Sequence, residues 1–423
     1  MTASLRLFTG NNRGYRRLFA AGLINGIGDR FSSIAMLALV LHLTGSGMAV
    51  GISLGVRVLP YLFMAPLGGL LASRLPRKGI MMTVDFLRVP VALSLMLVDG
   101  KEMLWLVYAG GFVMAAGEAV YSPVRKSYIP LLAAPEDLLR INGLEQLLNG
   151  CVLILGAFTG GLVSFYFGPD LAFVMNAVSF LTAGLLIMGI PHGSSAAVRD
   201  NNNVVQSAQA GSTGSSLSLT AGPPRRRALR KLIAGSLVLQ IVLCYELLVP
   251  IINGWDNVLI SVYAIQVFRA GDSGVGAFYA ALGIGLSLSF FAGRLLRTRL
   301  LAVALCGLLL EGVLLMAISN AGHFITVFLL YIVLSLAGGI GNASLDTLVM
   351  RETPAVLQPA VFGLLAAVSG TLLGLSMLTA GWLLDYVEPR MLGFAGGAGF
   401  AGIALLLGGY FLLQSSGNKL HQE

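Results

Sequence analysis

Charged residues are scarce in this chain, and their scarcity excludes an ordinary soluble protein. They make up 11% of its 423 residues, whereas hydrophobic residues make up 56%. About a quarter of the residues of a typical soluble domain are charged, so a soluble protein of this length would lack the polar surface that it needs. The composition therefore predicts an integral membrane protein, with the lipid bilayer as its surroundings.

Residues that carry enzymatic or metal chemistry are also sparse. The three cysteines, Cys151, Cys244 and Cys306, lie in apolar stretches and form neither a disulfide framework nor a metal-binding spacing. The four histidines are scattered, without metal or catalytic-triad spacing. No phosphate loop of the form G-x-x-x-x-G-K-S/T occurs, so ATP is not the energy source within this chain. We therefore predict a protein that is not an enzyme and needs no cofactor or metal.

Long apolar stretches, in contrast, recur along the whole chain. About 20 apolar residues in a helix cross the hydrocarbon core of a bilayer. Hydropathy predicts about twelve such helices, at roughly 17–43, 47–73, 79–98, 103–124, 138–166, 171–190, 232–267, 274–293, 300–319, 323–348, 357–384 and 391–415. With both termini in the cytoplasm, only Lys101, Arg269 and Arg390 fall outside the cell. The net charge of +8 then reflects the positive-inside rule and does not indicate a nucleic-acid partner.

One long polar stretch interrupts the apolar pattern. Residues 193–229 are rich in Ser, Asn, Gly and Ala and end in the basic run Arg225 to Arg227. Such a composition cannot bury enough apolar surface to order itself, so we predict a flexible cytoplasmic linker. It separates an N-terminal bundle of six transmembrane helices, residues 1–192, from a C-terminal bundle of six, residues 230–423.

The two halves look duplicated at an offset of 224 residues. The matching pairs include Gly69 with Gly293, Gly117 with Gly341, Pro130 with Pro354, Gly150 with Gly374, Asp29 with Asn253, Ser33 with Asn257, Glu118 with Asn342, and Ser122 with Asp346. Two six-helix repeats are the arrangement expected when one bundle rocks against the other around a site at the membrane midplane. The pattern predicts two pseudo-symmetric bundles that open alternately to either side.

The first span carries polar residues where they are costly. Asp29 and Arg30 lie near the middle of the apolar stretch 18–44. An ionised side chain at the bilayer centre costs about 2.5 to 3.5 kcal/mol on insertion scales and usually faces a bundle interior or a cavity. Asn25, Asp29 and Ser32 share one helical face by their spacing. We predict that this face points inward.

These features together resemble a known family. Twelve spans, a central cytoplasmic loop and a basic loop between spans two and three resemble the major facilitator superfamily over nearly the full length. The segment from Gly28 to Arg88 is similar to a branch of bacterial exporters that includes macrolide efflux and enterobactin export proteins. The family's loop signature falls on Gly69, Leu71, Ala72, Ser73, Arg74, Arg77 and Lys78, with Ser73 where Asp is usual and Pro76 where Gly is usual. The resemblance implies a gating loop on the cytoplasmic side.

A glycine-rich stretch in span five bears on the direction of transport. Exporters of this superfamily are similar in having a Gly-Pro and a Gly-Gly pair there. The matching residues are Gly150, Gly156, Ala157, Gly160 and Gly161, with Ala157 in place of Pro. Because Gly156 and Gly160 are four apart, one helix face loses its side chains and can pack closely on a neighbour. The resemblance favours export over import.

Buried acids are the candidates for proton coupling. Burial makes a carboxyl group hold its proton more tightly, so a cavity acid can exchange a proton when the cavity opens to the other side. The candidates are Asp29, Glu118, Glu246 and Asp346. The alternative is that each acid forms a structural ion pair with Arg30, Arg57 or Arg88. For Asp85, one helical turn from Arg88, we prefer this structural interpretation, and Glu145 and Glu311 have no assigned role.

A second group of polar and aromatic residues is expected to line the substrate cavity. These residues are Asn25, Arg30, Arg57, Tyr121, Tyr245, Asn253, Asp256, Asn257 and Asn342. Arg30 and Arg57 suit an anionic group, since guanidinium binds carboxylate or phosphate, although they could equally balance the charge of the buried acids. The aromatic residues could stack on a substrate or pack between helices.

These observations predict a monomeric secondary transporter in the bacterial cytoplasmic membrane. Its leading function is proton-coupled export of a small organic molecule, either a drug or a siderophore or metallophore. A lipid or lysophospholipid flippase of the same fold is the alternative, and a membrane sensor without transport is a third.

Overall fold

The computed structural model describes residues 13–45, 47–156, 159–160, 163, 166–191, 223–293 and 298–420. Within these ranges the chain is helical and contains no strand. Twelve helices of the described chain are long and apolar enough to cross a membrane, which confirms the predicted all-α membrane fold. The predicted linker lies outside the described residues from 193 to 222.

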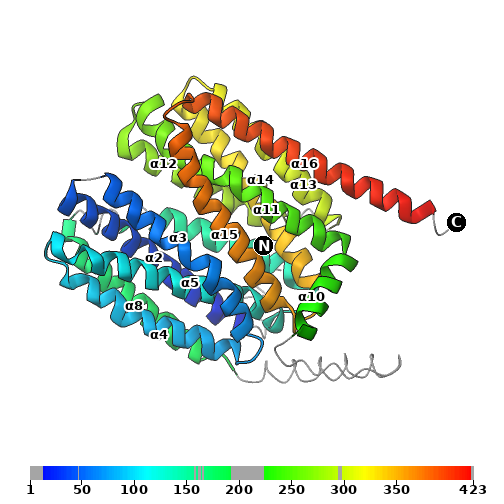
Figure 1. Ribbon diagram of the computed structural model, residues 1–423, viewed down its shortest axis with the longest axis horizontal. Coiled ribbons are helices and arrows are strands. Elements are labelled where there is room, and N and C mark those ends of the chain that lie inside the picture. Colours follow the sequence, from blue (N-terminus) through cyan, green and yellow to red (C-terminus); the bar gives the residue numbers. More distant parts are fainter. Residues whose placement is uncertain are drawn as a thin grey trace.

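The twelve spans form two groups, which Figure 1 shows in blue to cyan-green and in green to red. The first group comprises α2 (Arg13–Thr44), α3 (Gly47–Leu71), α4 (Arg77–Ser94), α5 (Leu104–Leu132), α6 (Leu138–Cys151) and α8 (Pro169–Met188). The second comprises α11 (Leu237–Val262), α12 (Gly271–Ala292), α13 (Leu300–Asn320), α14 (Phe324–Glu352), α15 (Gln358–Leu383) and α16 (Pro389–Leu420). A shorter helix, α10 (Pro223–Gly235), precedes the second group.

The ends of several helices follow from local sequence. Pro169, Pro223 and Pro389 begin α8, α10 and α16, as expected because proline lacks the N–H that the first turn leaves unused. Gly168, just before α8, has a φ of 81°, a left-handed conformation that glycine adopts at little cost. The helix α10 begins inside the stretch predicted as linker, where Arg, Ala and Leu favour helix.

The fifth span departs from a uniform α-helix. The sequence predicts one helix over 138–166, whereas α6 ends at Cys151 and continues as a π-helical turn from Val152 to Gly156. Such turns insert one extra residue per turn and are frequent at functional sites. Gly161, part of the predicted glycine stretch, lies outside the described residues.

The helix contacts repeat between the two groups. In the first group α2 packs on α8, α4 on both α8 and α5, and α3 on α5. The equivalent helices of the second group make the same contacts, α11 with α16, α13 with both α16 and α14, and α12 with α14. The two groups also contact each other in a symmetric way. Helix α15 packs on α3 and α5 of the first group, and α6, the counterpart of α15, packs on α12 and α14 of the second. This arrangement is that of two pseudo-symmetric six-helix bundles.

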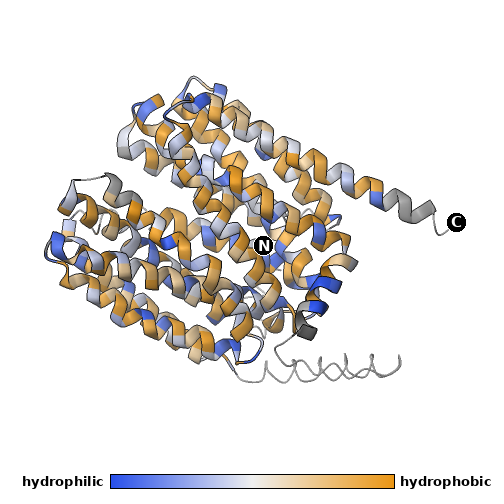
Figure 2. Cartoon of the chain, in the orientation of Figure 1, coloured by the Kyte–Doolittle hydropathy of each residue, from blue (hydrophilic) through white to orange (hydrophobic). Residues whose placement is uncertain are grey.

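Apolar side chains cover the outside of the molecule. Figure 2 shows hydrophobic residues along most of the helix surfaces, with hydrophilic residues concentrated near the helix ends. Large side chains such as Phe63, Leu406 and Leu413 are exposed, at 65%, 73% and 77%. Exposed apolar surface of this extent is stable in a bilayer, where the surrounding lipid is itself apolar.

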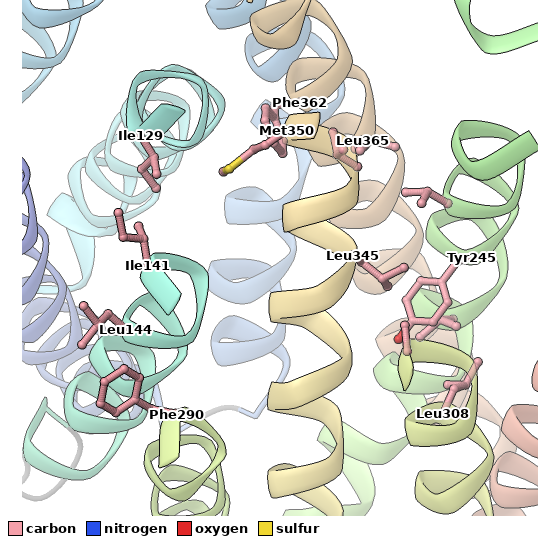
Figure 3. Packing of buried hydrophobic residues seen from close by; sticks show 14 of the residues in the cluster. Ile129, Ile141, Leu144, Tyr245, Phe290, Leu308, Leu345, Met350, Phe362 and Leu365 are labelled. Atoms are coloured by element: carbon pink, nitrogen blue, oxygen red, sulfur yellow. The ribbon is translucent and has the colours of Figure 1, made fainter. Parts of the chain in front are cut away.

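The surface between the two bundles is also largely apolar. Buried residues of both bundles form one cluster, which Figure 3 shows in part, with Ile141 and Leu144 of α6 near Phe290 of α12. Glycines allow two close contacts: a Cβ at Gly69 would collide with the carbonyl of Pro359, and one at Gly150 would lie 2.5 Å from the carbonyl oxygen of Gly283. Polar residues at this largely apolar interface are therefore candidates for a functional role.

Basic residues gather at one end of the molecule. At this end α2 begins, α3 meets α4, and α10 precedes α11, so that it carries Arg13, Arg74, Arg77 and Lys78. The loop from α3 to α4 contacts the loop from α14 to α15 there, because the Arg77 guanidinium donates to the carbonyl of Ala355 at 2.8 Å. We call this end the basic end.

Candidate functional site

A cavity of about 290 Å³ lies between the two bundles. The first bundle contributes α3 and α5, and the second contributes α11, α14 and α15. Its polar lining residues are Tyr61, Ser122, Lys126, Tyr245, Glu246, Asn253, Asn342, Asp346 and Ser369. Five residues predicted from the sequence are among them: Tyr245, Glu246, Asn253, Asn342 and Asp346. We call this space the central cavity.

Lys126 joins the two bundles at the central cavity. Its ammonium group lies 2.8 Å and 3.0 Å from the two carboxylate oxygens of Asp346 on α14 and 5.8 Å from the centre of the Phe362 ring. Its side chain stays 43% exposed and that of Asp346 19% exposed. The pair is thus accessible, and it can be broken without opening a sealed core.

Lys126 is a cavity residue that the sequence analysis does not predict, since its charge there contributes only to the positive-inside pattern. The signal was present, since Glu118, Ser122 and Lys126 are four residues apart and share one face of α5.

Glu246 lines the same cavity but forms no ion pair with another described residue. The Ser369 hydroxyl is its polar neighbour, and the charges of Lys126 and Asp346 act on it across the cavity. Burial of an ionised carboxyl group is expensive when no cation compensates it. Glu246 is therefore the carboxyl group of the central cavity that no described cation pairs with directly.

The first bundle holds a separate polar cluster around Arg88 of α4. The guanidinium of Arg88, buried within the bundle, lies 3.7 Å from Asp29 and 3.2 Å from Glu118, and it donates to the carbonyl of Met114 at 2.8 Å. Asn25 donates to Asp85 at 2.8 Å. We call Asn25, Asp29, Asp85, Arg88 and Glu118 the Arg88 cluster.

The two predicted coupling acids of the Arg88 cluster are paired but not sealed. The side chains of Asp29 and Glu118 are 27% and 37% exposed, although Arg88 itself is 2% exposed. For Asp85 the sequence favoured an ion pair with Arg88, whereas the structure has Arg88 in ion pairs with Asp29 and Glu118, the alternative that the sequence left open for these two acids. The rotation of α2 and α5 about their axes decides this pairing, and hydropathy does not report it.

The remaining predicted cavity residues are divided among other places. Arg57 lies against Gly111 of α5, within electrostatic reach of Asp29, and Arg30 is exposed on α2 with its stem against Gly156. Tyr121 is buried. None of these described side chains lines the central cavity.

On α11, one predicted cavity residue is buried within the second bundle and another bonds to its own helix. Asp256 is buried and accepts a hydrogen bond from the Tyr331 hydroxyl at 3.3 Å. The side-chain amide of Asn257 donates to the backbone carbonyl of Asn253 at 2.8 Å. Neither residue lines the central cavity in the described structure.

The predicted gating loop lies at the basic end. Arg77 donates to the carbonyls of Ser127 and Ala355 at 2.7 Å and 2.8 Å, which links the two bundles. Lys78 donates to the carbonyl of Ile190 at 2.7 Å, the Ser73 hydroxyl donates to Leu70, and Arg74 is exposed. Together with Gly69 against Pro359, the loop holds the bundles together at this end.

A further inter-bundle contact strengthens the basic end. The Asn142 side chain of α6 donates to Thr347 of α14 at 2.9 Å. The Arg77 and Asn142 contacts therefore join the two bundles at the basic end.

The predicted glycine stretch lies farther along the fifth span and packs at two interfaces. Gly150 meets Gly283 of the other bundle, whereas Gly156 and Gly160 meet Arg30 and Phe31 of α2.

Glu145, to which the sequence assigns no role, is paired with a cation and a tyrosine hydroxyl. Glu145 pairs with Arg125, whose Nη2 lies 3.1 Å from Oε1, and the Tyr15 hydroxyl donates to the same oxygen at 3.0 Å. These bonds connect α2, α5 and α6 within the first bundle, which is the structural role that a buried ion pair commonly has.

The fold and the cavity between two repeats define a class, that of membrane transporters with two six-helix bundles. The family model of the Major Facilitator Superfamily matches residues 18–369. The chain belongs to this superfamily, as the resemblance in its sequence predicted.

Two bacterial relatives match parts of the chain. Macrolide efflux protein A of Streptococcus pyogenes is 28% identical over 138 residues, which cover 31% of this chain and 34% of that protein. The uncharacterized MFS-type transporter YfiS of Bacillus subtilis (strain 168) is 24% identical over 182 residues, 43% of each chain. The chain thus matches less than half the length of these relatives.

Solved structures match over nearly the whole chain. The human organic anion transporter MFSD10 (TETRAN) aligns with a TM-score of 0.70 at 14% identity and covers 93% of this chain and 99% of that chain. A bacterial homologue of the iron transporter ferroportin, in an outward-facing state, aligns with a TM-score of 0.68 at 18% identity and covers 93% and 98%. At such identities the likeness shows the shared fold.

Proposed function

We propose that this protein exports a small organic molecule across the bacterial cytoplasmic membrane by alternating access, in exchange for protons. The observation that carries the proposal is the central cavity, in which Glu246 has no ion-pair partner among the residues the structure describes and lies beside the Lys126–Asp346 pair that joins the bundles.

The charge distribution supports an orientation. By the positive-inside rule the basic end would face the cytoplasm, and the proposal keeps both termini on that side. Contacts of Arg77, Asn142 and Lys126 close that end. The described conformation is then the one closed to the cytoplasm, and substrate would leave from it on the external side.

Glu246 is the candidate for the exchanging group, and Asp346 is the second. A proton on Glu246 removes the charge that would hold a cationic substrate, so proton and substrate exclude each other at this side chain. Asp29 and Glu118 remain candidates in the Arg88 cluster, but their pairing with Arg88 supports a role in holding α2, α4 and α5 together.

The lining of the central cavity bears on the substrate class. It contains two carboxyl groups and one ammonium group, whereas Arg30 and Arg57 lie elsewhere. When ionised, these groups sum to a negative charge, which favours a substrate with a basic amine over an anionic metal chelator. The likeness to macrolide efflux protein A over part of the chain supports drug export in the same direction.

The proposal is tested with the full-length protein in inside-out membrane vesicles with an imposed pH gradient, acidic inside. We expect uptake of erythromycin, a macrolide with a basic amine, that collapses with the gradient and is lost in Glu246→Gln. Glu102→Gln, an exposed acid remote from the central cavity, is the matched control and should transport normally. Erythromycin uptake that does not depend on the pH gradient, or normal uptake by Glu246→Gln, would refute proton exchange at Glu246. Movement of a fluorescent lysophospholipid without movement of erythromycin would support the flippase instead.

A further inference from the structure

The helix α10, between the two bundles, carries a dense basic sequence. Its residues are PPRRRALRKLIAG, with five cations between positions 225 and 231 and no acid. Arg230 and Lys231 lie three and four residues after Arg227, so that the three share one helical face, and all three are exposed. Clusters of this density immediately beside a membrane span are typical of sites for anionic lipid headgroups.

The opposite face of α10 is apolar. Leu229, Leu232 and Ile233 share it by their spacing, all three are half-buried, and Leu229 packs against the main buried cluster of the protein. This packing fixes which way the helix is turned. With the apolar face held against the bundle, the basic face points away from the protein.

No acid within the described part of the chain pairs with this basic face. Among the described residues, Arg227, Arg230 and Lys231 form no ion pair. The acid recorded beside the end of α10 is Glu352, which accepts a hydrogen bond at 3.1 Å from the Ser236 hydroxyl instead. The exposed cations are therefore available to an external anion.

The position of α10 selects the anion. The helix ends at Gly235, Ser236 caps the next helix by accepting from the Leu239 N–H at 3.3 Å, and the membrane span of α11 begins at Leu237. A helix one residue away from a span lies at the depth of the lipid headgroups. Phosphate groups of lipids are the anions present there in quantity.

We propose that α10 is a binding site for the phosphate groups of anionic phospholipids in the leaflet at the basic end. Bound lipid would hold the start of the second bundle at the membrane surface. The site is separate from the central cavity, so it stands or falls independently of the proposed transport.

The experiment uses the full-length protein, purified and exposed to mixed micelles of phosphatidylglycerol and phosphatidylcholine, with retained lipids counted by native mass spectrometry. The test variant combines Arg227→Gln, Arg230→Gln and Lys231→Gln. The control combines Arg13→Gln, Arg16→Gln and Arg351→Gln, which removes the same charge from exposed positions at the same end. Each cation near an anionic surface contributes about 1 kcal/mol, so the test variant should lose about 100-fold in preference for phosphatidylglycerol.

Four results would overturn the proposal. Phosphatidylglycerol could be retained equally by the test variant, or lost equally by the control, which would indicate a general effect of charge. Phosphatidylcholine could be retained as strongly, which would indicate apolar docking alone. Displacement of phosphatidylglycerol by millimolar inorganic phosphate would indicate a site for the free ion rather than for lipid.

Discussion

The two bundles differ in how arginine compensates the acids within them. In the first bundle Asp29 and Glu118 share the buried guanidinium of Arg88. In the second, Asp256 accepts a hydrogen bond from the Tyr331 hydroxyl, and Glu311 lies against Gly338 of α14. Neither acid forms an ion pair with a described residue. The repeated helix contacts thus coexist with different electrostatics.

The 224-residue offset explains how the difference arises. Arg88 falls on Gly312, where there is no side chain and where the backbone of α16 approaches closely. Asp29 falls on Asn253 and Glu118 on Asn342, both neutral residues that line the central cavity. The two halves thus share their helix packing, whereas the ion pairs around Arg88 have no counterpart among the described residues of the second bundle.

Removing Arg88, the cation shared by Asp29 and Glu118 in the first bundle, should have the largest effect on stability. Arg88→Met leaves Asp29 and Glu118 partly buried without a partner, and we expect a loss of about 3 kcal/mol in stability. Thermal unfolding of the purified protein measures it, with Arg30→Met, an exposed cation of the same bundle, expected within about 0.5 kcal/mol of the wild type. Adding Asp29→Asn and Glu118→Gln to Arg88→Met should restore most of the stability. A fully stable Arg88→Met protein would mean that the cluster holds nothing together.

Proton coupling should depend on the unpaired carboxyl more than on a paired one. We expect Glu246→Gln to lower gradient-driven erythromycin transport by more than about tenfold, within the usual range of coupling between sites. Asp29→Asn should lower it less, because Arg88 keeps Glu118 as a partner. The reverse order in the vesicle assay would move the exchange site into the Arg88 cluster.

Breaking the pair that bridges the bundles should shift the conformational balance. Lys126→Gln removes an accessible ion pair worth about 1 kcal/mol or less, so the population open at the basic end should rise by about fivefold at most. Spin labels on exposed Leu75 and Arg351, in a background without other cysteines, would report longer distances. Lys126→Arg, which can keep the pair, is the control, and unchanged distances in Lys126→Gln would show that the pair does not hold the end closed.

The smallest effect on stability is expected for Glu311 in the second bundle. Glu311→Gln replaces a carboxyl group that has no cation with a neutral group of the same shape, so stability should stay within about 0.5 kcal/mol or rise. Leu308→Ala, a buried neighbour one turn away on α13, should cost about 2 to 5 kcal/mol and shows that thermal unfolding senses this place. A large loss in Glu311→Gln would reveal a partner that makes this bundle resemble the first.

The sequence predicted the twelve spans because hydropathy is a local property of each segment. It also predicted the repeat, whose polar positions Asn253, Asn342 and Asp346 do meet at the central cavity. It could not predict that Arg30 and Arg57 lie away from that cavity, since a few tens of degrees of helix rotation decide which face of a span points inward. The same limit hid Lys126, whose partner Asp346 is 220 residues away.

Gly150 and Gly283 bring the two backbones into direct contact at mid-molecule, where a single added methyl group would lie 2.5 Å from the opposing carbonyl oxygen. Helices this close leave no space for side chains to slide past each other, and separating them would form no new favourable contact. In the alternating-access cycle that we propose, the change of access would proceed as a tilt about this contact, with one end opening as the other closes.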